Sequence, residues 1–175
     1  MGLEELFGRI EKRFGKEAVV GNDIKVDTVS SGSMALDEIL GGGFALGRIH
    51  EIYGGFSSGK SSAALHLSAS VQKTLGKAVG YVDTEQALDL EYAKALGVDL
   101  SRDKWIMSQP DSAEQALEIV REMLEVPEIG LVVLDSVAGL VPEAVLQGEA
   151  GDAKIALVAR LMSQQLSILK NVCKK

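Results

Sequence analysis

A glycine-rich stretch with one lysine is the part of this sequence best suited to bind phosphate. Residues 54–61 read Gly-Gly-Phe-Ser-Ser-Gly-Lys-Ser, which fits the phosphate-binding loop (P-loop) pattern. Its glycines let the backbone curl so that several N–H groups point at one anion. Lys60 would reach the β- and γ-phosphates of a nucleotide, and the Ser61 hydroxyl would bind Mg²⁺. The expected nucleotide-binding residues here are Gly54, Gly55, Phe56, Ser57, Ser58, Gly59, Lys60, Ser61 and Ser62.

Two acidic residues follow apolar stretches and could act on the same phosphates. Asp135 ends the apolar run 131–134, and Glu85 follows the run Tyr-Val-Asp at 81–83. Ligands of parallel sheets gather at the carboxyl ends of strands, so we expect Asp135 to hold Mg²⁺ through water. Glu85 could orient and deprotonate the water that attacks the nucleotide, or it could be a surface residue in a loop. Ser136 is either a partner of Asp135 or a turn serine.

Strands and helices are expected to alternate around these residues. The pattern predicts strands at 49–53, 78–83, 105–108 and 131–135, and helices at 3–14, 60–75, 91–96, 112–124 and 154–171. Such alternation indicates an α/β fold with a mainly parallel sheet flanked by helices and preceded by an N-terminal helix. The run 131–134 is apolar throughout, as in strands that are buried on both faces of a sheet. The P-loop then lies between a strand and a helix, which disfavours a plain glycine-rich turn.

Composition and charge limit the class of protein. The 175 residues are 46% hydrophobic and 25% charged, which is typical of one globular domain. No run of eighteen apolar residues predicts a membrane span, and the acidic start Met1–Glu5 is unlike a signal peptide. A single cysteine, Cys173, also suits a reducing compartment, so we expect a cytoplasmic protein. The net charge of −7 argues against indiscriminate binding to nucleic acid.

Further motifs follow one another along nearly the whole chain. They are Val29–Ser33 with Leu36-Asp37, Gly47–Gly54, Asp83–Asp89 with Tyr92-Ala93, Ser108–Asp111 with Glu114–Glu118, Asp135–Ala138, and Gly148–Asp152 with Ala159–Gln164. With these motifs in this order, the sequence resembles the RecA recombinase family. The resemblance implies an ATP-dependent DNA recombination and repair protein, and a DNA-dependent ATPase that uses ATP with Mg²⁺. In a full-length context it implies filaments on single-stranded DNA for homologous pairing and strand exchange.

The resemblance also assigns roles to residues. It implies that Glu85 activates water, that Tyr92 stacks on adenine and that Asp89 lies beside the base. Without it, Tyr92 would be interpreted as a helix packing residue. The implied DNA-binding residues are Gly148, Glu149, Gly151, Asp152, Arg160 and Ser163. Because the loop around Glu149 is acidic, its DNA contacts would rest on backbone amides and a helix N-terminus.

The resemblance divides the chain into two parts. Residues 1–30 would form an N-terminal helix and oligomerisation segment that packs on a neighbouring protomer, and residues 31–175 an incomplete ATPase core. The apolar residues Leu3, Phe7 and Ile10 could instead cover this chain's own core. Since the sequence has roughly half the family's usual length, we expect only weak single-stranded DNA binding by this chain alone. The alternatives are a non-catalytic paralogue that modulates filaments, or another ATPase of the same fold.

Overall fold

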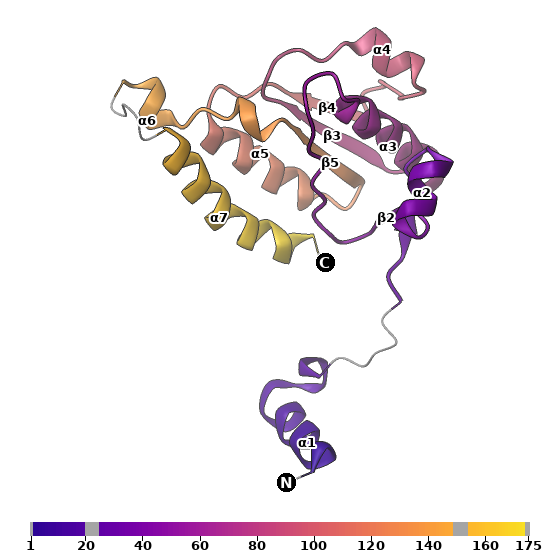
Figure 1. Ribbon diagram of the computed structural model, residues 1–175, viewed down its shortest axis with the longest axis vertical. Coiled ribbons are helices and arrows are strands. Elements are labelled where there is room, and N and C mark those ends of the chain that lie inside the picture. Colours follow the sequence, from indigo (N-terminus) through magenta and orange to yellow (C-terminus); the bar gives the residue numbers. More distant parts are fainter. Residues whose placement is uncertain (1, 20–24, 149–153, 174–175) are drawn as a thin grey trace.

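The computed structural model describes residues 2–19, 25–148 and 154–173 (Figure 1). Its helices are α1 (Leu3–Phe14), α2 (Met34–Leu40), α3 (Lys60–Leu75), α4 (Leu90–Ala95), α5 (Ala113–Leu124), α6 (Glu143–Leu146) and α7 (Lys154–Val172). Its strands are β1 (Thr28–Val29), β2 (Phe44–Ala45), β3 (Ala78–Asp83), β4 (Trp105–Ser108) and β5 (Ile129–Asp135). Two short 3₁₀ helices are η1 (Lys16–Ala18) and η2 (Val137–Gly139). The predicted α/β fold with its N-terminal helix is confirmed.

A three-stranded parallel sheet is the centre of the fold. The strand order is β4-β3-β5, and β1 pairs with β2 in a separate antiparallel ribbon. Every residue of β3 is buried, because β3 has a strand on each edge and helices on both faces. In the register of β3 and β5, Tyr81 lies opposite Val133 and Asp83 opposite Asp135. The carboxyl ends of these two strands therefore meet at one edge of the sheet.

Alternating side chains of β3 supply two hydrophobic cores. Val79 and Tyr81 belong to the core that includes α3 residues such as Leu65. Val82 points to the opposite face and packs with residues of α5 such as Leu117. Helix α7 packs against α5 on the same side. Helix α3 thus covers one face of the sheet and α5 the other (Figure 1).

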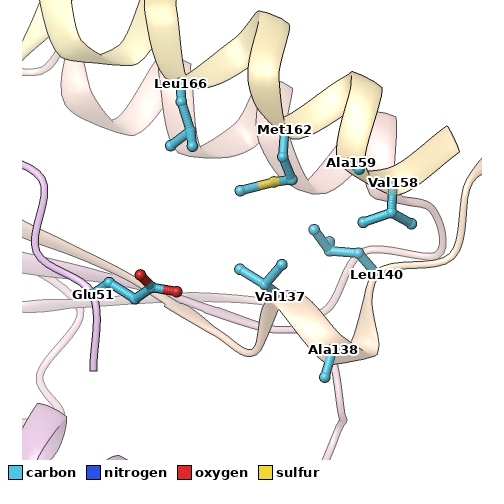
Figure 2. Close-up of a pocket in the computed structure, with 8 residues that line it drawn as sticks. All are labelled: Glu51, Val137, Ala138, Leu140, Val158, Ala159, Met162 and Leu166. Carbon is cyan, nitrogen blue, oxygen red and sulfur yellow. The ribbon is translucent and has the colours of Figure 1, made fainter. Parts of the chain in front are cut away.

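The strand predicted at residues 49–53 is absent from both sheets. Within the described ranges this segment has no regular secondary structure and pairs with no strand. A cavity of about 460 Å³ borders this segment. Figure 2 shows Glu51 on one side of it and the α7 residues Met162 and Leu166 on the other. An extended segment becomes a strand only when a neighbour accepts and donates its backbone hydrogen bonds.

Strand β5 lies at the edge of the sheet and is only partly buried. Its side chains nevertheless pack on both faces, as predicted, with Leu131 and Val133 against one core and Val132 and Leu134 against the other.

Helix α1 is separate from both cores. It buries none of its residues, and the exposed fractions of Leu3 and Phe7 are 72% and 44%. Figure 1 shows it standing away from the sheet. Its apolar residues therefore do not cover the core in the described structure, contrary to the simpler of the two interpretations. None of the helices in the described ranges combines the length and apolar character of a membrane span.

Candidate functional site

The P-loop residues form an exposed turn that leads into α3. Gly59 caps the helix with a φ of 89°, a left-handed conformation that favours glycine. Gly54 lies so close to Ser58 that an added Cβ would be 2.8 Å from the Ser58 Oγ. The Lys60 Nζ donates hydrogen bonds to the carbonyl oxygens of Gly54 and Gly55, at 3.3 and 2.8 Å. The lysine thus lies back across the loop.

The start of α3 has the properties of an anion site. Its first backbone N–H groups have no partner within the helix, and sixteen aligned peptide dipoles add positive potential there. Residues 54–59 and Ser61 are exposed, so a phosphate can approach them. The Ser61 hydroxyl lies in the first turn, one residue after the Lys60 ammonium. These groups fit a phosphate group and one oxygen ligand for a hard cation such as Mg²⁺.

The two predicted acidic residues lie at or just after the carboxyl ends of the paired strands β3 and β5. The Ser136 Oγ donates a hydrogen bond to the Glu85 Oε1 at 2.5 Å. The Ser136 N–H donates to the Thr84 Oγ1 at 2.9 Å, and that hydroxyl donates to the Ser136 carbonyl at 2.6 Å. Glu85 is therefore tied to the residue directly after Asp135. Ser136 is therefore more than a simple turn serine. Its hydroxyl contacts Glu85, and not Asp135 as one of the two interpretations held.

Tyr81 is a contact of the site that sequence reasoning missed. Its hydroxyl donates a hydrogen bond of 2.6 Å to the Asp135 Oδ2, and its side chain is fully buried. Burial first, and then the hydrogen bond to Asp135, raise the pKa of the Tyr81 phenol well above its ordinary value. Tyr81 therefore stays a protonated donor at neutral pH. The alternation of side chains along a strand could have indicated this contact. Val133 and Asp135 lie on the same face of β5, and Val133 is opposite Tyr81 in the register.

The loop that carries Glu85 is held by a buried aspartate. The Asp83 Oδ2 accepts hydrogen bonds from the Leu88 N–H and the Gln109 Nε2, both at 3.1 Å. Gln86, in the same loop, has a φ of 53°. Asp83 and Gln109 matched the family motifs, but no role was predicted for either. Their hydrogen bonds fix the path of residues 84–88, and with it the position of Glu85.

The predicted base-contacting residues lie beside the start of α3. Asp89 is the N-cap of α4, where its Oδ1 accepts a hydrogen bond from the Tyr92 N–H at 3.0 Å. The Tyr92 hydroxyl shares a hydrogen bond of 3.0 Å with the Ser62 Oγ of α3. The side chain of Tyr92 is 44% exposed, so it is only partly packed against its surroundings. Its hydroxyl therefore lies at the first turn of α3, and part of its side chain is exposed to a ligand.

Comparison with known protein families matches the RecA N-terminal domain over residues 2–175. The chain belongs to the RecA family. It is 50% identical to Protein RecA of Latilactobacillus sakei over 99% of its own length and 49% of that protein. It is 51% identical to Protein RecA of Lactobacillus delbrueckii and 48% identical to that of Listeria monocytogenes, again over 99% of its length. The chain spans about half the length of these curated relatives, covering 53% and 50% of the latter two.

The residues expected to contact DNA in this RecA-family chain are only partly placed. Gly148 follows α6 with a φ of 78°, while Glu149, Gly151 and Asp152 lie outside the described residues. Arg160 and Ser163 are both exposed on α7, one helical turn apart. The structure therefore brings Arg160 and Ser163 onto one accessible helix face, and it leaves the loop before them undescribed.

A metal in this RecA-family site would need ligands from more than the protein. Among the described residues, no group of three or more histidine, cysteine, aspartate or glutamate side chains could hold an ion. Mg²⁺ commonly keeps several waters and binds through one or two protein oxygens plus substrate phosphates. The Ser61 hydroxyl and the Asp135 carboxylate suit that mode of binding.

Proposed function

We propose that this chain is the ATP-binding and Mg²⁺-binding part of a RecA-type DNA recombination and repair protein. The observation that carries the proposal is the P-loop at the start of α3, combined with Asp135 at the end of β5 and Glu85, which follows β3 and is bonded to Ser136. This is the set of groups that phosphoryl transfer to water requires: a phosphate cradle, a cation site and a base. The family membership supports ATP as the nucleotide.

Each group has one role in the proposed reaction. Lys60 and the backbone amides of residues 54–59 would bind the β- and γ-phosphates and offset their negative charge. Ser61, and Asp135 through water, would hold Mg²⁺, which supplies further charge neutralisation when bound. Glu85 would take a proton from the attacking water, and the hydrogen bond from Ser136 would orient its carboxylate.

Calorimetry tests the nucleotide part of the proposal. Titration of ATP and of ADP into the 175-residue chain should release heat in the presence of Mg²⁺, and binding should weaken strongly in EDTA. The metal dependence is expected because the phosphates are bound together with the ion. A chain that is folded by circular dichroism but gives no heat with either nucleotide would contradict the proposal.

The base pocket gives a second test. Tyr92 would stack on adenine, and Asp89 would hold the start of α4 beside it. Tyr92→Ala should weaken ATP binding by roughly 1–3 kcal/mol, the scale of aromatic stacking on a base. Tyr92→Phe is the matched control, since it keeps the ring and removes only the hydroxyl that contacts Ser62. An alanine variant with unchanged affinity and a lowered melting temperature would make Tyr92 a packing residue.

The DNA part of the proposed function belongs to a longer context. In that context, residues 1–30 would form the oligomerisation segment and residues 31–175 the ATPase core of a filament on single-stranded DNA. The exposed apolar residues of α1 support a contact with a neighbouring protomer. Gly148, Glu149, Gly151, Asp152, Arg160 and Ser163 would contribute the DNA contacts. Because the proposed substrate is cellular DNA, we propose that the protein acts in the cytoplasm.

Single-stranded DNA should bind weakly to this chain alone. Its net charge of −7 repels phosphate, and the basic residues Lys154 and Arg160 are offset by Glu149 and Asp152. Fluorescence anisotropy on labelled oligothymidine should show binding at low salt that is lost as salt rises, with no gain from a non-hydrolysable ATP analogue. Tight, cooperative and ATP-enhanced binding at physiological salt would show that these 175 residues are sufficient.

A further inference from the structure

The buried hydroxyl of Tyr81 contacts the carboxylate of Asp135, which we propose holds Mg²⁺ through water. Tyr81, in the middle of β3, donates its hydrogen bond of 2.6 Å to the Asp135 Oδ2, across 54 positions in the sequence. A hydroxyl that is removed from water without a partner costs free energy, so its single acceptor matters. The apolar core around Tyr81 needs a ring but no hydroxyl. Asp135 is therefore the reason that a tyrosine, and not a phenylalanine, suits this position.

The Tyr81 ring has little freedom to move. Its side chain is fully buried, and its ring lies against Trp105 with centroids 5.2 Å apart and planes inclined by 31°. Residues of α3 and β3, such as Leu65 and Val79, complete the surrounding core. A hydroxyl on a fixed ring is a fixed donor. It therefore restricts rotation of the Asp135 carboxylate at the end of β5, where the strand itself is only half-buried.

The contact has a counterpart on the neighbouring strand. Tyr81 of β3 holds Asp135 of β5, while Ser136, just after β5, holds Glu85, just after β3. Each carboxylate of the proposed site is thus anchored by a hydroxyl that comes from the other strand. The register of β3 and β5 sets both contacts at once.

We propose that Tyr81 is a positioning residue for Asp135, whose hydroxyl keeps one carboxylate oxygen fixed so that the other can hold a Mg²⁺-bound water beside the nucleotide phosphates. The inference rests on the proposed nucleotide function. Groups that orient a metal ligand in this way commonly affect metal affinity about 10- to 100-fold when removed.

The test compares the Mg²⁺ requirement of nucleotide binding in Tyr81→Phe and the unchanged chain. A fluorescent ATP analogue is titrated at fixed concentration with increasing Mg²⁺, and the half-saturating Mg²⁺ concentration is measured. We expect this concentration to rise about tenfold or more in Tyr81→Phe. Binding of the analogue in EDTA should be unchanged. Tyr53→Phe is the matched control, because Tyr53 is 87% exposed and its hydroxyl lies in solvent.

The possible outcomes separate the inference from the function on which it rests. If the unchanged chain binds no nucleotide in Mg²⁺, the proposed function fails. If it binds in a Mg²⁺-dependent way and Tyr81→Phe has the same half-saturating Mg²⁺, the positioning role is wrong. A lowered melting temperature with an unchanged Mg²⁺ requirement would also overturn it, because only a packing role would then remain. Direct titration of Mn²⁺, followed by electron paramagnetic resonance in the presence of ATP, should show the same ratio between the two proteins.

Discussion

Lys60→Ala should reduce the affinity of the chain for MgATP by at least about 100-fold. A hydrogen bond to a charged group contributes roughly 1.5–3 kcal/mol, and this lysine would reach both the β- and the γ-phosphate. The helix dipole and loop amides would remain, but they would lack the one mobile positive charge inside the loop. Calorimetry with ATP and with ADP, both in Mg²⁺, measures the change.

The fold should survive the loss of Lys60. Its recorded hydrogen bonds are to the carbonyl oxygens of Gly54 and Gly55, two exposed residues of the same loop. The melting temperature should therefore stay close to that of the unchanged chain. Lys73→Ala is the matched control, since Lys73 is exposed in the last turn of the same helix. Equal nucleotide binding by Lys60→Ala and Lys73→Ala would mean that residues 54–61 form only a turn.

Glu85→Gln should remove most ATP turnover and leave nucleotide affinity nearly unchanged. A positioned general base contributes about 10²–10⁴-fold to a rate, and an amide cannot take the proton from water. Glutamine keeps an oxygen that can accept the hydrogen bond from the Ser136 Oγ, so the local geometry should persist. The water, and not the phosphates, is the group that Glu85 would contact, which is why binding should not suffer.

Turnover is measured best where the rest of a RecA-type protein is present. The chain can be joined to the part of a RecA relative that follows the matched region, and ATPase activity is then followed with single-stranded DNA. Glu122→Gln is the control, because Glu122 is an exposed residue of α5, on the face of the sheet opposite α3. If the Glu85→Gln protein has ordinary turnover, Glu85 is only a surface residue of a βα loop and has no catalytic role.

Most helices could be predicted from the sequence, because helical hydrogen bonds join nearby residues, but α2 and α6 were not predicted. Helical spacing of apolar residues gave α1 and α7 to within a residue, and the helix expected from Ser112 begins with that serine as its N-cap. The Ser112 Oγ accepts a hydrogen bond from the Gln115 N–H, a contact that spans three residues. The P-loop conformation is local in the same way, because glycine, lysine and a helix start occur together within eight residues.

The contacts of the site were decided by strand pairing. The sequence nominated Glu85 and Asp135 separately, but only the parallel register of β3 and β5 places Ser136 on Glu85 and Tyr81 on Asp135. The same dependence explains the wrong strand at 49–53, where the residue pattern suits a strand and no neighbour supplies the ladder. A strand and its contacts are non-local, since their hydrogen bonds join residues tens of positions apart. The sequence by itself therefore predicted the phosphate loop that we propose, while the tertiary structure decided which hydroxyl groups contact Glu85 and Asp135.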